Sequence, residues 1–163
     1  MSTELKDIKQ YLTFSLGGEV FAIDVIKTRE ILNMSTITQV PQTPDYMLGV
    51  INLRSSVVPV IDMRLKFGME RIEQSVDSCI VVIEVKVDDE AITVGALVDS
   101  VQEVVDLDDA QIEPPPRLGT RLKTEFLRGM GNQNDNFIMI LDIDKVFSSE
   151  ELCLVQDVTE EAV

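Results

Sequence analysis

Runs of alternating apolar and polar residues cover most of the chain, and they come in pairs separated by short turns. The first pair covers residues 11–16 and 20–23, with Gly17-Gly18 between them. Period-two alternation is typical of half-buried strands, and two runs joined by a two-residue glycine turn predict a β-hairpin. The same pattern predicts three more hairpins, over residues 48–54 with 57–62, 80–87 with 91–98, and 126–130 with 136–142. The fold class is therefore mainly all-β, a small barrel or sandwich.

Helical signals are few and short. A short helix is expected within residues 25–32, and single helical turns are expected after Asp62 and Asp142. A C-terminal helix is expected over residues 151–163, because Ser148-x-x-Glu151 has the form of a capping box ahead of apolar residues. Helices therefore contribute only short segments to the predicted fold.

A weak internal repeat lies behind the hairpins. Gly49, Asp62 and Phe67 recur 80 positions later as Gly129, Asp142 and Phe147. We expect one domain over residues 9–150 made of two similar β units, roughly residues 10–75 and 78–150, with strands possibly exchanged between them. Units this small bury little surface alone, so an apolar seam should join them. Chance matches between strands of any all-β chain remain the alternative.

Two local features indicate where another protein could dock. Pro59 interrupts the strand at residues 57–61, and proline cannot donate to a central ladder, so this strand should be an edge or carry a bulge. Residues 40–48 form a turn-rich segment that carries Tyr46, Met47 and Leu48. This segment is either a contact surface or a cover for the end of a barrel.

The charge balance excludes several partners. Lys plus Arg total 14 and Asp plus Glu total 29, for a formal net charge of −15. Nucleic acids and anionic lipids bind through cations, so neither is expected as a partner. The same charge favours partner surfaces that are neutral or basic. No apolar stretch is long enough for membrane insertion, and no signal peptide is recognisable, so a cytoplasmic protein is expected.

The residues needed for catalysis or metal binding are largely missing. Histidine is absent, which removes the commonest general base and zinc ligand. The acidic runs at 106–109 and 132–136 lack the glycine and the final acid of a calcium loop. Cys79 and Cys153 are expected to be two free thiols in a reducing compartment. No enzyme, cofactor or metal site is therefore predicted, and a small carboxylate-based hydrolase is the rival hypothesis.

The sequence resembles the bacterial chemotaxis coupling proteins of the CheW family. The resemblance is carried by residues 49–54 (GVINLR) followed by 57–64 (VVPVIDMR), and it extends to residues 11–14, 23–31, 112–115, 124–129 and 140–142. One departure is Ser55, where the family usually has glycine. Glycine would suit a turn with positive φ, so the geometry of this turn is in question.

The resemblance implies two small five-stranded SH3-like barrels packed on each other. It also implies a non-enzymatic adaptor that couples the cytoplasmic tips of chemoreceptors to the regulatory domain of the histidine kinase CheA. Pairing of like barrels, including other CheW copies, would build rings in receptor arrays to which this cytoplasmic protein is recruited. The alternatives are a coupler of a non-flagellar or gene-regulatory chemosensory pathway and, with less support, an oligonucleotide-binding type of barrel.

The resemblance also implies binding residues. The family's Glu and Arg positions match Glu30 and Arg54, which are expected to form an ion pair on the interaction surface. Receptor binding is expected along the seam between the barrels, at Thr28, Glu30, Ile31, Gly49, Asn52, Arg54 and Val98. Kinase binding is expected on the turn-rich segment and the proline-containing strand, at Val40, Thr43, Tyr46 and Val57.

Overall fold

The computed structural model describes residues 8–33, 37–39, 45–70, 75–87, 89–114, 126–133 and 136–146. All four predicted hairpins are confirmed by antiparallel pairing. They consist of β1 (Lys9–Leu16) with β2 (Glu19–Asp24), β4 (Met47–Leu53) with β5 (Ser56–Asp62), β6 (Cys79–Val87) with β7 (Glu90–Val98), and β10 (Leu127–Gln133) with β11 (Asn136–Leu141).

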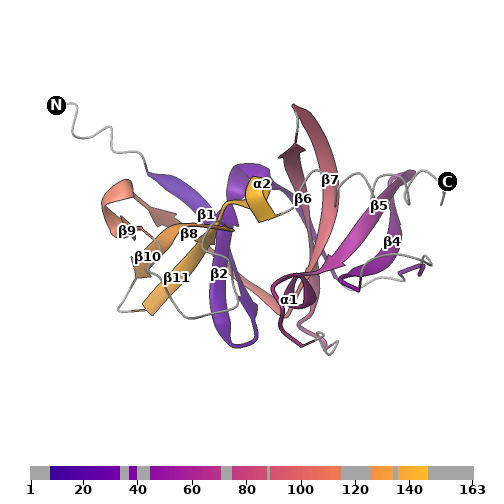
Figure 1. Cartoon of the computed structure of the whole chain (residues 1–163), viewed down its shortest axis with the longest axis horizontal. Helices are drawn as coiled ribbons and strands as arrows, with labels where there is room; N and C mark the ends of the chain where they lie inside the picture. Colours follow the sequence, from indigo (N-terminus) through magenta and orange to yellow (C-terminus); the bar gives the residue numbers. More distant parts are fainter. Residues whose placement is uncertain are drawn as a thin grey trace.

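The strands form two sheets that lie side by side (Figure 1). One sheet has six strands in the order β8-β1-β2-β11-β10-β9, where β8 is Ser100–Leu107 and β9 is Ile112–Glu113. The other has five strands in the order β3-β6-β7-β5-β4, where β3 is Thr28–Asn33. The mainly β fold class with two packed β units is confirmed. The sixth strand of the first sheet is the two-residue β9, which pairs only with β10.

Each sheet contains strands from both halves of the sequence. β1 and β2 pair with β8 and β11, and β3 pairs with β6. In each sheet one hairpin joins the other strands through a parallel ladder. These ladders pair β11 with β2 in the six-stranded sheet and β5 with β7 in the five-stranded sheet. Both hairpins also carry a register shift at matching places, Met47/Gly49 and Leu127/Gly129. The sequence units 10–75 and 78–150 therefore do not coincide with the two sheets.

The helical segments differ from expectation at one place. The single turns after Asp62 and Asp142 are confirmed as α1 (Met63–Lys66) and α2 (Ile143–Val146). The Asp62 carboxylate caps α1 by accepting from the backbone N–H groups of Arg64 and Leu65 at 3.0 and 3.2 Å. The short helix predicted within 25–32 is confirmed only for its first three residues, the 3-10 helix η2 (Val25–Lys27), and β3 follows it. The residues of β3 alternate in burial, as expected for a strand that pairs with β6. The predicted C-terminal helix lies outside the described residues.

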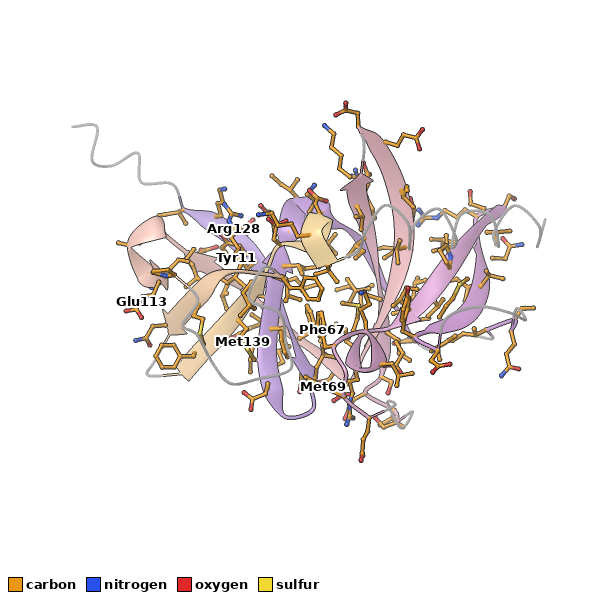
Figure 2. The ribbon with its side chains drawn as sticks, viewed as in Figure 1. Tyr11, Phe67, Met69, Glu113, Arg128 and Met139 are labelled. Atoms are coloured by element: carbon orange, nitrogen blue, oxygen red, sulfur yellow. The ribbon has the colours of Figure 1, made fainter. Side chains whose placement is uncertain are left out.

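An apolar seam joins the two sheets. A chain of aromatic rings crosses it, with centroid separations of 6.1 Å from Phe14 to Phe21, 5.8 Å from Phe21 to Phe67, and 6.0 Å from Phe67 to Phe126. Figure 2 shows the Phe67 side chain between the sheets. These rings belong to one buried cluster that includes residues of both sheets. A smaller cluster of buried side chains around Tyr11 consists of residues of the six-stranded sheet.

The prediction that the strand at Pro59 is an edge or carries a bulge fails in both forms for the strand as a whole. β5 lies between β7 and β4, and the register shift of the β4–β5 ladder falls on β4, between Met47 and Gly49. The structure accommodates the proline in another way. The parallel ladder between β5 and β7 begins only at Val60, which pairs with Gly95. Residues 56–59 therefore have no partner on the β7 side, and the missing N–H of Pro59 interrupts no bond there.

Candidate protein-binding groove

The turn between β4 and β5 fixes the position of Arg54. Leu53 pairs with Ser56, so the turn has only two residues, Arg54 and Ser55, and both have positive φ, 51° and 69°. This is the requirement of the two-residue turns that match the twist of a hairpin. The Asn52 side-chain oxygen accepts a hydrogen bond from the Ser55 N–H at 3.1 Å. Serine thus adopts the conformation for which glycine is better suited.

Arg54 and Glu30 form the ion pair expected from the sequence. The Nη1 of Arg54 lies 3.1 Å from Oε2 of Glu30, and its Nη2 lies 3.5 Å from Oε1. The pair joins the β4–β5 turn to β3, which lies at the opposite edge of the five-stranded sheet. The sheet must therefore curl strongly to bring the two residues together. A partly exposed pair of this kind adds little stability, roughly 0–1 kcal/mol.

A groove of about 530 Å³ lies between the curled strands. It opens where β5 and β7 separate, because their ladder starts at Val60 and the preceding residues diverge. Its apolar lining comes from β4, β5, β6 and β7, and its charged lining comes from β3 and the β4–β5 turn. The lining residues are Arg29, Glu30, Leu53, Arg54, Ser56, Val57, Val58, Pro59, Val82, Ala91, Ile92 and Thr93.

The sequence did not identify a second ion pair, between Arg29 and Glu84. The register of β3 against β6 shifts between Thr28 and Glu30, so Arg29 is an inserted residue. Such a β-bulge re-aims side chains, and here Arg29 and Glu30 both line the groove. The charged residue Glu84 within the apolar run 80–87 was the available signal. A bulge has no comparable signature in the sequence.

The other residues expected to bind the receptor are partly exposed and partly buried. Ile31 is 45% exposed and Asn52 is exposed, while Thr28 is half-buried at the start of β3. Val98 and Gly49 are buried, so we do not retain them as contact residues. A Cβ at Gly49 would lie 2.1 Å from the Thr38 carbonyl oxygen, so this glycine permits a close backbone approach. Only Glu30 and Arg54 of this set line the groove, whose lining belongs wholly to the five-stranded sheet and its turn. The placement of the set along the seam stays a prediction.

Of the four residues expected to bind the kinase, the two that the structure describes, Val57 and Tyr46, lie at opposite ends of the β4–β5 hairpin. Val57 is half-buried and lines the groove, where it pairs with Asn52 next to the turn. Tyr46 adjoins the other end of the same hairpin, where Met47 pairs with Ile61. There the Nζ of Lys66 lies 5.3 Å from the Tyr46 ring centroid and 5.4 Å from that of Phe126. Tyr46 is therefore beside the seam. Val40 and Thr43 lie outside the described residues.

The described residues hold no cluster of three His, Cys, Asp or Glu side chains that could bind a metal ion. Cys79 is half-buried and its thiol donates to the Asp77 carbonyl at 3.2 Å, while Cys153 is outside the described residues. Within the same part of the chain, no helix has the length and apolar character of a membrane span. The site is therefore a groove whose lining combines apolar residues with the charged residues Arg29, Glu30 and Arg54.

Residues 10–151 match the family described as the CheW-like domain. Chemotaxis protein CheW of Klebsiella aerogenes is 38% identical over 152 residues, which cover 93% of this chain and 89% of the relative. Chemotaxis protein CheW of Rhizobium meliloti is 34% identical, with 88% and 90% covered. The crystal structure of the scaffolding protein TtCheW from Thermoanaerobacter tengcongensis superposes with a TM-score of 0.77 at 34% identity, covering 88% of this chain and 90% of that one.

Proposed function

The chain belongs to the CheW family of chemotaxis coupling proteins, and from this premise we propose that it joins the cytoplasmic tips of chemoreceptors to the regulatory domain of the kinase CheA. The family is one of scaffolds and adaptors, so the chain acts by binding two proteins and catalyses no reaction. The chain acts in the cytoplasm, where it is recruited to receptor arrays at the membrane. Other copies of the chain join the same arrays.

The groove beside Glu30 and Arg54 is the surface that carries this proposal. Receptor tips are helical hairpins, and an amphipathic helix docks by placing apolar side chains in a groove. The floor of the groove offers Val57 and Val58, and its walls carry the Glu30–Arg54 pair. Ion pairs at the rim of an interface orient the partner more than they add affinity. We therefore assign Glu30 and Arg54 to the receptor contact, together with the exposed Ile31 and Asn52. We also move Val57 from the expected kinase contact to the receptor contact, because it lines the same groove.

The surface around Tyr46 is the candidate contact for the kinase. It lies at the far end of the β4–β5 hairpin from Val57. The two partners then occupy different ends of one hairpin, which permits simultaneous binding. An aromatic ring next to a lysine is suited to an interface because it combines apolar area with a polar edge.

Charge reversal tests the receptor contact. Glu30→Arg and Arg54→Glu, each alone, place like charges opposite each other and should abolish activation of CheA by receptors in a reconstituted assay. Both variants should keep the circular dichroism spectrum and melting temperature of the parent, because the pair is exposed.

The matched control is Glu103→Arg. Glu103 is exposed on β8, the edge strand of the six-stranded sheet, and Glu103-Val104 follows Glu30-Ile31 of the edge strand β3 at an offset of 73 positions, a second match between the two halves of the sequence. This variant should activate the kinase normally. Full activity of both groove variants would refute the assignment of the groove to the receptor.

A further inference from the structure

The bulge in β3 gives the groove a charged wall that regular pairing would not provide. In a regular strand, Arg29 and Glu30 would point to opposite faces of the sheet. The register shift between Thr28 and Glu30 makes Arg29 the extra residue, and both side chains line the groove as a result. Two arginines, Arg29 on one side and Arg54 at the turn, therefore stand at the same groove.

The arginines are more exposed than the carboxylates with which they pair. The side chains of Arg29 and Arg54 are 54% and 80% exposed, whereas those of Glu84 and Glu30 are 32% and 24% exposed. A docking partner thus meets guanidinium groups before it meets carboxylates. On a chain of net charge −15, the mouth of the groove thus exposes two guanidinium groups, although the two ion pairs together carry no net charge. A partner that fits here should carry negative charge, contrary to what the net charge alone predicts.

Arg29 has more unused donor capacity than Arg54. An arginine side chain presents five N–H donors. Arg54 directs both terminal nitrogens at Glu30. Among the described residues, Arg29 is paired through Nη2 with Oε2 of Glu84. Its remaining N–H groups are available to a second carboxylate at the mouth of the groove.

We propose that the receptor tip bound in this groove presents an aspartate or glutamate next to its apolar anchor, and that Arg29 binds this carboxylate and sets receptor preference. This inference rests on the proposed function, because it assumes that the groove receives a receptor tip. The apolar anchor lies on Val57, Val58 and Ile92. The carboxylate lies over Arg29 and forms a charge-assisted hydrogen bond, a type roughly twice as strong as a neutral one.

The test is a titration of the full chain with a receptor signalling-tip fragment, by calorimetry at 50 mM and 300 mM salt. Arg29→Gln should weaken binding by roughly 10-fold or more at low salt, the effect expected on losing a hydrogen bond to a charged group. The loss should shrink at high salt, because screening weakens exposed charges. Arg29→Lys should retain part of the affinity, because it keeps the charge and loses the planar fork.

The matched control is Gln102→Glu, which makes the same change of one negative charge. Gln102 is exposed on β8 and lies 73 positions after Arg29, at the same offset that relates Glu103 to Glu30. It should change receptor affinity less than about 2-fold, because its charge lies away from the groove. Glu84→Gln should keep or improve binding, because it releases Arg29 from its partner.

A rescue experiment identifies the receptor residue. Each aspartate and glutamate of the tip fragment is changed to arginine in turn and titrated against Arg29→Glu. Recovery of binding with one such fragment supports the pairing. Equal affinity of Arg29→Gln and the parent chain at both salts would overturn the inference while leaving the proposed function intact. Equal loss of affinity for the CheA regulatory domain would also overturn it. Failure of the parent chain to bind any tip fragment would refute the proposed function and, with it, this inference.

Discussion

The Oδ1 of Asp99 lies 3.6 Å from the Nη1 of Arg64, so the connection between β7 and β8 is tied to α1. A corresponding tie holds the other crossing between the sheets. There, Oδ2 of Asp144 in α2 lies 2.9 Å from Nζ of Lys27, in the connection between β2 and β3. Arg64 and Asp144 lie 80 positions apart, the offset of the repeat, and the charges of the two ties are reversed. In both, the helix that follows a β-hairpin holds the segment where the chain passes from one sheet to the other.

Asp99→Ala should lower the free energy of unfolding by about 1–3 kcal/mol. The substitution removes the tie to Arg64 and also the hydrogen bond that the Gly17 N–H donates to Oδ2 at 2.7 Å. Urea unfolding followed by circular dichroism measures the change. Asp99→Asn keeps an oxygen acceptor for Gly17 and should lose about half as much. An equal loss for both substitutions would show that the charge, and not the hydrogen bond, carries the effect.

Ser55→Gly should stabilise the chain by roughly 0.5–1 kcal/mol, because Ser55 has φ of 69° and a side chain disfavours that region. Thermal unfolding should show a higher midpoint. Ser56→Gly is the control: Ser56 begins β5 and pairs with Leu53, so glycine there should be neutral or destabilising. Receptor affinity should not change for Ser55→Gly, since Asn52 still accepts from the backbone N–H at position 55. A decrease in stability would contradict the strain argument.

Phe67→Ala should cost about 3–5 kcal/mol, the usual range for removing a buried aromatic ring. Phe67 is 4% exposed and contacts the rings of both Phe21 and Phe126 across the seam. Phe137→Ala is the control, because Phe137 is 54% exposed, and it should have little effect. Denaturant titration with fluorescence and circular dichroism should give coincident transitions. Separate transitions for the two probes in Phe67→Ala would show that the sheets unfold independently.

Val57→Lys and Tyr46→Lys should separate the two binding activities. Val57 lines the groove, so lysine there should weaken receptor-fragment binding by roughly 10-fold, through loss of an apolar contact and addition of a buried charge. Tyr46 lies beside the seam next to Lys66, so Tyr46→Lys should weaken binding to the CheA regulatory domain. Both affinities are measured for both variants by calorimetry. Loss of both activities in each variant, with an unchanged melting temperature, would show that one surface serves both partners.

Local chemistry explains which elements could be predicted from the sequence. The β1–β2 hairpin was predictable because its alternation and its Gly17-Gly18 turn lie within a few residues of each other. The caps at Asp62 and the apolar seam were predictable for the same reason: each depends on residue type and spacing. Residues 28–32 were not predicted as a strand because the short apolar pattern also fits a helix, and only pairing with β6 makes them one.

The site was harder to predict because it depends on non-local geometry. The Glu30–Arg54 pair came from a family resemblance, and the structure shows the curl that brings the residues together. Arg29 was missed because a bulge depends on register, which single-strand patterns do not specify. Pro59 was assigned to an edge because the sequence does not show that the β5–β7 ladder starts one residue later. Val57 and Tyr46 were both assigned to the kinase contact because they are close in the sequence. In the structure they lie at opposite ends of the β4–β5 hairpin.

The six-stranded sheet combines strands from distant parts of the chain, which has a consequence for folding during translation. The parallel neighbour of β2 is β11, which is synthesised more than a hundred residues later. During translation the emerging β1–β2 hairpin is an isolated pair of strands, which is marginal in water. The five-stranded sheet, by contrast, has all its strands once Val98 has left the ribosome. We expect the five-stranded sheet to form first on the nascent chain. The β10–β11 hairpin, which is synthesised last, then completes the six-stranded sheet. We expect this pairing of β11 with β2 to be the slow step, because contacts between residues far apart in the sequence form slowly.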